Sequence, residues 1–215
     1  SDIVVGHASY NSTNWKHPQF DDSNATIWKF GDTELGAGDG GERTVINIGP
    51  SGARYPVVYF RKKFTVTNPA QYEALELEAL IDDGAIFYLN GREVARLTMP
   101  SGAAGYAYNS LNAANEAAFL PVTDARLLPS ALVEGVNTFC VQVHQANATS
   151  TDLSFDLRLR GRKNTFSAPA YLAPGLQTVK ARAFNSTTST WSALSEATYL
   201  VDAEAPTAAN LAISE

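Results

Sequence analysis

Strict alternation of apolar and polar residues in several short segments is the feature that most constrains the fold of this chain. Apolar side chains occupy every second position of residues 75–81, with Glu76 and Glu78 between them. Residues 139–143 and 153–159 repeat the pattern. A period of two is typical of a β-strand with one buried and one exposed face, whereas a helix repeats about every 3.6 residues. The sequence therefore predicts an all-β fold of antiparallel strands.

The dipeptide Asn90-Gly91 marks the clearest turn, because it separates two apolar segments, residues 86–89 and 93–95. Asn-Gly is the favoured two-residue loop of a tight β-hairpin. When the direction of each strand is traced onward from this turn, four polar loops are predicted to lie at the same end of the fold. We call that end the loop rim. The four loops are residues 36–56, 82–84, 98–116 and 145–152. Loops on a rigid sandwich commonly carry binding residues, so we expect a ligand site there.

The composition excludes several classes of protein. Hydrophobic residues make up 45% and aromatic residues 10% of the 215 residues, which is enough for a sizeable core. The formal net charge is −6 and the basic residues are scattered, which argues against nucleic acid or anionic membrane as a partner. No apolar run approaches the length of about 18 residues that membrane insertion needs. The single cysteine, Cys140, lies on an expected strand, which favours a packed thiol over a nucleophile.

The chain divides into three expected parts. Residues 1–162 form the main β-sandwich, and residues 163–202 form a small β-hairpin unit that packs on it or belongs to an incomplete sandwich, with Trp191 as its anchor. Residues 203–215 are expected to be a linker and the start of a following domain. The first residues carry no signal peptide, so we expect a fragment of a longer, multidomain protein.

The loop of residues 36–42 contains three glycines with the spacing of a dinucleotide-binding motif. That motif needs a strand before it and a helix after it, whereas residues 44–48 here are typical of a strand. A plain glycine-rich loop is therefore favoured. Asp39 and Glu42 offer carboxylate oxygens, which suit a calcium ion, although no EF-hand spacing is present.

Two polar features of the loop rim have several interpretations. Asp82-Asp83 is compatible with an ordinary Asp-Asp-Gly turn, with hydrogen bonding to a ligand, or with the paired carboxylates of a glycosidase. His144 lies beside Gln145 at an expected strand end, where a hydrogen-bonding role and a structural role are equally compatible with the sequence. No zinc-binding or serine-hydrolase motif accompanies it.

Aromatic residues in the rim loops suit a carbohydrate, because sugar rings present apolar faces that lie on aromatic rings while their hydroxyls bind polar groups. The best candidates are the segment of Tyr106, Tyr108 and Asn109, followed by Tyr55 with Arg54 beside it. Trp15 and Trp28 are more compatible with packing at the edge of the core.

Five segments in combination resemble the galactose-binding-like jelly-roll modules that serve as accessory domains in large secreted or surface bacterial proteins, including polysaccharide-degrading enzymes. They are residues 36–42, 59–66, 82–91, 141–145 and 152–157. The resemblance implies an antiparallel jelly-roll β-sandwich without catalytic activity, an affinity for carbohydrate and a frequent structural calcium. Residues 179–184 and 191–198 resemble the last strands of small β-sandwich repeats that follow such modules.

The leading hypothesis from the sequence is a secreted or surface carbohydrate-binding module that is not an enzyme. Its partners would be a polysaccharide or glycan and the other domains of its parent protein, and it requires no cofactor, with a structural Ca²⁺ as an option. The expected ligand-binding residues are Arg54, Tyr55, Asp82, Asp83, Tyr106, Tyr108, Asn109, His144 and Gln145, and the expected metal ligands are Asp39 and Glu42. The first alternative is a structural or protein-interaction spacer, whose rim loops would pack on one another or would form a flat apolar patch. The second is a small glycan hydrolase or lyase.

Overall fold

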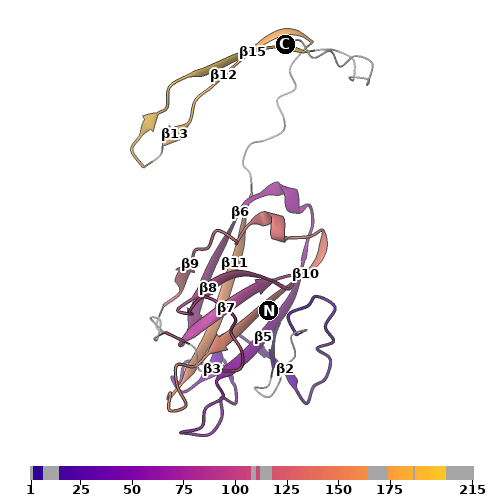
Figure 1. Ribbon diagram of the computed structural model, residues 1–215. Helices are drawn as coiled ribbons and strands as arrows, with labels where there is room; N and C mark the ends of the chain where they lie inside the picture. The colour runs from indigo at the N-terminus through magenta and orange to yellow at the C-terminus, as the bar shows by residue number, and fades with distance from the viewer. Residues whose placement is uncertain are drawn as a thin grey trace. The chain divides into compact units, whose positions relative to one another are not determined.

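The computed structural model describes residues 2–6, 15–107, 110–111, 118–163, 174–185 and 187–201. The chain separates into two compact units, Ser1–Asn164 and Thr165–Glu215 (Figure 1). The predicted linker and following domain, residues 203–215, lie outside the described residues. Among the residues described, no helix is long and apolar enough to cross a membrane.

The first unit is built on a six-stranded sheet in which every neighbouring pair is antiparallel. Its strands, in spatial order, are β2 (Trp28–Asp32), β1 (Asp2–Gly6), β5 (Val57–Val66), β10 (Gly135–His144), β7 (Gly84–Leu89) and β8 (Arg92–Leu97). β7 and β8 join through Asn90 and Gly91, whose φ angles of 51° and 83° suit a tight hairpin turn. The predicted hairpin is confirmed.

A second, five-stranded sheet packs against the first. Its strands, in spatial order, are β4 (Thr44–Val45), β3 (Leu35–Ala37), β11 (Leu153–Lys163), β6 (Tyr72–Ile81) and β9 (Leu120–Val122). All pairs are antiparallel except β3 with β4. Short 3-10 turns at Pro69–Gln71 and Pro129–Ala131 are the helical elements among the described residues. From β5 to β11 the chain passes repeatedly between the two sheets, and the predicted all-β, antiparallel jelly-roll sandwich is confirmed.

The core between the sheets follows the alternation of the sequence. Phe139, Val141 and Val143 of β10 are buried in it, as are the alternating apolar residues of β6. Phe60 of β5 stacks on Phe155 of β11 with ring centroids 4.2 Å apart, which joins the two sheets at their centre. The residues predicted to face the core therefore do so.

The outer face of the six-stranded sheet is covered as well, which the sequence analysis did not predict. Residues 15–28 and 98–106 supply side chains to a second hydrophobic cluster on this face. The cluster comprises Trp15, Trp28, Val57, Tyr59, Ile86, Tyr88, Met99 and Cys140. The predicted packing role of the two tryptophans is confirmed, but they pack in this outer layer and not at the edge of the main core.

Cys140 lies in this outer layer with no exposed surface, and burial raises the pKa of its thiol to about 12. The thiolate is the form that attacks a thiol reagent, so burial slows the reaction by limiting both access to Cys140 and its ionisation. We expect the native protein to react with an aromatic disulfide reagent at pH 8 at least about 100-fold more slowly than the protein unfolded in guanidinium chloride. Equal rates in the two states, followed by absorbance, would contradict this burial.

The described part of the second unit is a two-stranded antiparallel hairpin in two segments. β12 (Gly175–Ala181) pairs with β15 (Ser195–Val201), and β13 (Phe184–Asn185) pairs with β14 (Thr190–Trp191), with the β13–β14 pair nested between β12 and β15. The rings of Trp191 and Phe184 are in contact, with centroids 4.7 Å apart. The Arg182 guanidinium carbon lies over the Trp191 ring, 4.5 Å from its centroid. The predicted role of Trp191 as an anchor on the first unit stays a prediction.

Candidate functional site

Two loops of the predicted rim are joined by Arg54. Its Nε donates to the carbonyl of Ser150 at 2.9 Å and its Nη2 to the carbonyl of Thr151 at 3.1 Å. Its Nη1 donates at 2.6 Å to Gly49 of its own loop. Residues 36–56 and 145–152 therefore meet at one end of the sandwich, as the strand directions predicted.

Asp83 and Gln145 extend this contact to the other rim loops. The Asp83 carboxylate accepts a hydrogen bond of 2.6 Å from the backbone N–H of Ala146. The Gln145 side chain donates to the carbonyl of Asp152 at 2.8 Å, and its backbone N–H donates to Pro56 at 3.0 Å. The bonds from Ala146 to Asp83 and from Gln145 to Pro56 run between loops, whereas the Gln145 side chain braces its own loop at Asp152. Together they hold the rim from inside.

His144 is fully buried beneath the third loop. Its Nδ1 lies 3.0 Å from the carbonyl of Ala107, which can only accept, so Nδ1 carries the proton. Burial lowers the pKa of the imidazole, against a smaller opposite effect of this hydrogen bond. His144 is therefore a neutral donor that fastens residues 98–107 to the end of β10.

Asp82, Asp83, His144 and Gln145 were predicted to bind ligand at an open rim, and the structure places all four at most 6% exposed. The strand directions correctly predicted that these loops lie at one end of the sandwich. They could not show that the loops close over their own polar side chains. In this arrangement Asp83, His144 and Gln145 brace the loops, and all four side chains are almost entirely shielded from solvent.

The remaining predicted rim residues are more dispersed. Arg54 and Tyr55 are half-buried. Tyr106 is half-buried and packs against the outer cluster on the six-stranded sheet, next to the Ala107 carbonyl that His144 binds. Tyr108 and Asn109 lie outside the described residues.

The two predicted metal ligands lie close together in the glycine-rich loop. Glu42 accepts a hydrogen bond of 2.9 Å from the backbone N–H of Asp39, and the Asp39 carboxylate accepts one of 2.6 Å from Ser154. Within the described part of the chain, no three His, Cys, Asp or Glu side chains gather as a metal-binding group. The calcium site stays a prediction.

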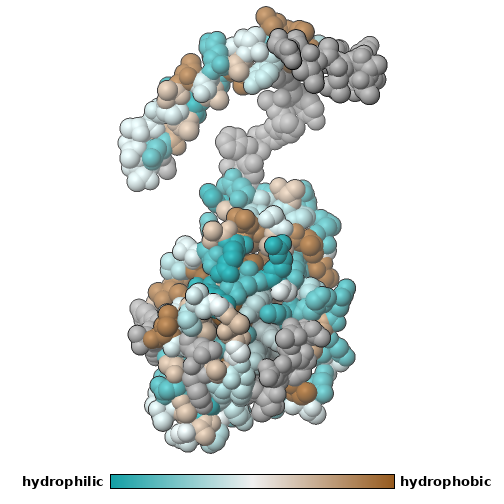
Figure 2. Space-filling view, in the orientation of Figure 1, coloured by the Kyte–Doolittle hydropathy of each residue, from teal (hydrophilic) through white to brown (hydrophobic). Residues whose placement is uncertain are grey.

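A groove of about 590 Å³ opens on the outer side of β7 and β8, and we call it the outer groove. Its lining includes the backbone of residues 101–104 and five side chains, Lys16, Tyr88, Glu93, Arg96 and Arg126. Hydrophilic residues gather over β7 and β8 on the face shown in Figure 2. This volume falls within the range of about 300–1,000 Å³ typical of small-molecule sites.

An irregularity in the β7–β8 pairing places Glu93 and Arg96 on the same face. Glu93 lies opposite Tyr88 and Ala95 lies opposite Phe87, so Val94 is an extra residue in β8. In a regular strand, positions three apart face opposite sides of the sheet. The bulge reverses this relation, and both charged side chains reach the outer groove.

Glu93 is held between two guanidinium groups. Arg96 binds it in a bidentate manner, with Nε–Oε1 at 2.7 Å and Nη2–Oε2 at 2.8 Å, and Arg126 donates to Oε1 from the other side. The hydrogen bonds from Arg96, with those from Arg126, hold the pKa of Glu93 below its usual range. The carboxylate therefore stays ionised at neutral pH.

The two arginines also fix the walls of the groove. Arg96 donates to the carbonyls of Pro100 and Gly102, which ties the covering loop to β8. Arg126 forms a bidentate pair with Asp124, at 2.9 Å and 2.7 Å. Rigid placement of polar groups in this way is what recognition of a polar ligand requires.

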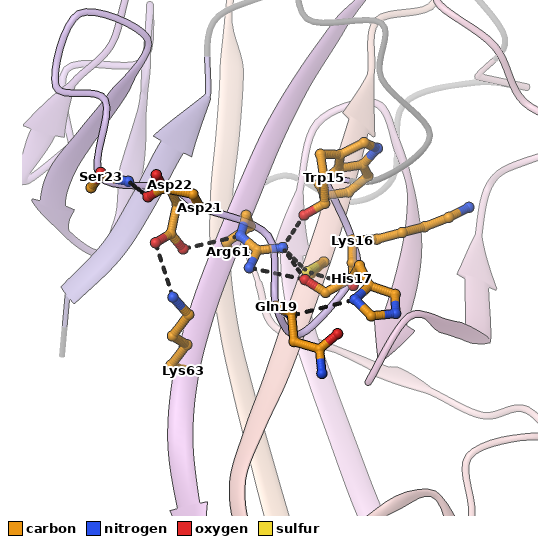
Figure 3. A network of polar contacts seen from close by, with 10 residues as sticks. Trp15, Lys16, His17, Gln19, Asp21, Asp22, Ser23, Arg61 and Lys63 are labelled. Atoms are coloured by element: carbon orange, nitrogen blue, oxygen red, sulfur yellow. Dashed lines mark hydrogen bonds and ion pairs between the residues drawn. The ribbon is translucent and has the colours of Figure 1, made fainter.

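Lys16 is positioned at the groove by a buried arginine (Figure 3). Arg61 on β5 has a side chain with no exposed surface and donates to the backbone carbonyls of Trp15 and His17, on either side of Lys16. It also pairs with Asp22 at 3.1 Å. The Lys16 side chain extends away from Arg61, with Nζ 4.5 Å from the centre of the Tyr88 ring.

No pattern in the sequence predicted the outer groove. Its residues come from four separate segments, and a regular alternation assigns Glu93 and Arg96 to opposite faces of β8. The one available signal was the Asn90-Gly91 hairpin, which set the position of β8 but not its bulge.

The fold and the groove define a β-sandwich module with a concave surface on its outer layer that is lined by charged side chains. No protein-family model and no curated protein matches this chain. Among solved structures it is similar to a β-glucuronidase of Bifidobacterium dentium, with 18% identity, a TM-score of 0.42, and coverage of 67% of this chain and 19% of that one.

Two further similar structures match 94% of this chain. One is a glycosyl hydrolase family 2 member of Bacteroides cellulosilyticus, with 12% identity, a TM-score of 0.44 and 28% of that chain covered. The other is a β-glucuronidase of Bacteroides uniformis, with 13% identity, a TM-score of 0.44 and 25% of that chain covered. This chain thus spans only 19–28% of the length of these three proteins, and similarity at this level assigns it neither their activity nor their ligands.

Proposed function

We propose that this chain is a non-catalytic carbohydrate-binding module of a larger secreted or surface protein, and that the outer groove is its binding site. The observation that carries the proposal is the placement of Glu93, Arg96 and Arg126 along one groove of about 590 Å³. Guanidinium and carboxylate groups offer paired, planar hydrogen-bonding sites, which suit the neighbouring hydroxyls of a sugar ring.

The chemistry of the groove favours binding over hydrolysis. Glycosidases generally use two carboxyl groups that flank the scissile bond, one of them protonated as the acid. The described lining of the outer groove contains one carboxylate, Glu93. Because its pKa is lowered by two arginines, Glu93 is a poor proton donor at neutral pH.

The test is a glycan microarray on the purified chain, followed by calorimetry on the best ligand for wild type, Arg126→Ala and Arg43→Ala. Arg126 lies in the groove, whereas Arg43 is an exposed arginine paired with Asp32. We expect Arg126→Ala to weaken binding about tenfold or more, because a hydrogen bond to a charged group contributes roughly 1.5–3 kcal/mol. Arg43→Ala should bind as wild type does.

Two results would count against the outer groove or the function itself. Binding that survives Arg126→Ala but is lost in Tyr55→Ala would return the site to the loop rim. Absence of binding to any glycan by the folded wild type would favour a structural spacer. The mutual packing of the rim loops through Arg54, Asp83 and Gln145 is the observation that favours this second function.

A further inference from the structure

The outer groove carries more positive than negative charge, although the chain as a whole is acidic, with a formal net charge of −6. Lys16, Arg96 and Arg126 line it against the single carboxylate of Glu93. Asp124, which pairs with Arg126, still leaves one positive charge in excess. The groove is therefore locally positive on a chain that is acidic as a whole.

Lys16 is the cation that supplies the excess. Among the described residues no carboxylate lies within ion-pair distance of the Lys16 ammonium group. Its Nζ lies 4.5 Å from the centre of the Tyr88 ring. Its backbone is fixed by the Arg61 hydrogen bonds to Trp15 and His17. A lysine that is held at a groove and has no carboxylate partner among the described residues is available to an anionic ligand.

Arg126 retains donors for the same ligand. Its side chain is 48% exposed, and Nε, Nη1 and Nη2 each make one hydrogen bond to Asp124 or Glu93. A guanidinium group has five N–H donors, so each terminal nitrogen keeps one for a further acceptor. Arg96 is more fully used, because it binds Glu93 and the carbonyls of Pro100 and Gly102.

We infer that the outer groove selects an acidic saccharide, with Lys16 and Arg126 as the contacts of its anionic group. This inference rests on the proposed carbohydrate-binding function and adds the class of sugar. A carboxylate of a uronic acid and a sulfate ester share the required chemistry, namely a negative charge with several acceptor oxygens. A neutral sugar satisfies the hydroxyl-binding groups but leaves the Lys16 charge without a partner.

The experiment compares matched pairs of ligands by calorimetry on the full chain. One pair is a galacturonic acid oligosaccharide and its methyl ester, and the other is a sulfated galactan oligosaccharide and its desulfated form. We expect at least one acidic member to bind about tenfold or more tightly than its neutral counterpart. Which pair shows the difference distinguishes carboxylate from sulfate. The affinity should also fall with increasing salt.

Lys16→Gln tests the assigned contact, with Arg43→Gln as the control for loss of one positive charge elsewhere. We expect Lys16→Gln to reduce the preference for the acidic member about tenfold while the affinity for the neutral member stays unchanged. Arg43→Gln should preserve both affinities. Unfolding curves of all three proteins verify that each is folded at the temperature of the titration.

Each contrary outcome identifies which idea fails. Equal affinity for both members of each pair, still lost in Arg126→Ala, would overturn the acidic preference and leave the carbohydrate function standing. If Lys16→Gln and Arg126→Ala both leave the preference for the acidic ligand unchanged, the outer groove is not the site that binds the anionic group. No glycan binding at all would overturn both proposals.

Discussion

Replacing Arg61 by methionine is expected to lower the free energy of unfolding by about 3–5 kcal/mol, the cost typical of removing one member of a buried ion pair. Methionine fills a similar volume but donates no hydrogen bond. Asp22 would lose its buried partner and keep only the partly exposed Lys63, and the carbonyls of Trp15 and His17 would lose their donor. Denaturant unfolding at pH 7 measures the change.

Arg43→Met is the matched control, because the Arg43 side chain is 72% exposed and pairs loosely with Asp32 at 3.6 Å. We expect this change to remain within about 0.5 kcal/mol of wild type. A similar loss in both variants would contradict the structural role assigned to Arg61.

The pH dependence of the Arg61 effect has a defined sign. Burial favours a raised pKa for Asp22, but hydrogen bonds from Lys63 and Arg61 outweigh it, so the pKa of the folded state is lowered. A lowered carboxyl pKa stabilises the folded state above the ordinary Asp pKa of about 3.9, and the contribution is lost as the pH falls through the folded-state value. The stability gap between wild type and Arg61→Met should therefore narrow below about pH 4.

Truncation of Phe155 to alanine is expected to cost about 3–5 kcal/mol, as is usual for removing a buried phenylalanine. The Phe155 side chain is 1% exposed and stacks on Phe60 between the two sheets. Its removal leaves a cavity that rigid strands on both sides can close only in part. Thermal and denaturant unfolding would both register the loss.

Phe30→Ala is the corresponding control, because it removes the same side chain at a position that is 68% exposed on β2. We expect a change of about 0.5 kcal/mol or less. Comparable losses at positions 30 and 155 would mean that the sandwich core is not where the structure places it.

The sandwich itself was predictable because a strand's two faces are encoded locally. Alternation in β6, β10 and β11 identifies which side chains enter the core, since successive residues point to opposite sides of a sheet. The Asn90-Gly91 turn was equally predictable, because few dipeptides adopt two consecutive left-handed conformations without strain. Strand directions then brought the rim loops to one end correctly.

The fate of polar side chains was less predictable. His144, Asp83 and Gln145 have the chemistry of ligand-binding residues, and the sequence gives no indication that their side chains bind backbone groups of the rim loops themselves. Whether a polar group meets solvent or the protein's own carbonyls depends on how loops distant in sequence pack, so local pattern cannot decide it.

The sequence by itself determined the all-β class, the main strands, the core-facing residues and the hairpin, because each depends on neighbours within a few positions. The tertiary structure alone decided that residues 15–28 and 98–106 cover the outer sheet face and that the rim closes on itself. It also decided that a bulge at Val94 aligns Glu93 with Arg96 beside Lys16. These features depend on contacts between distant segments and on one extra residue in a strand, and an alternating pattern carries no information about either.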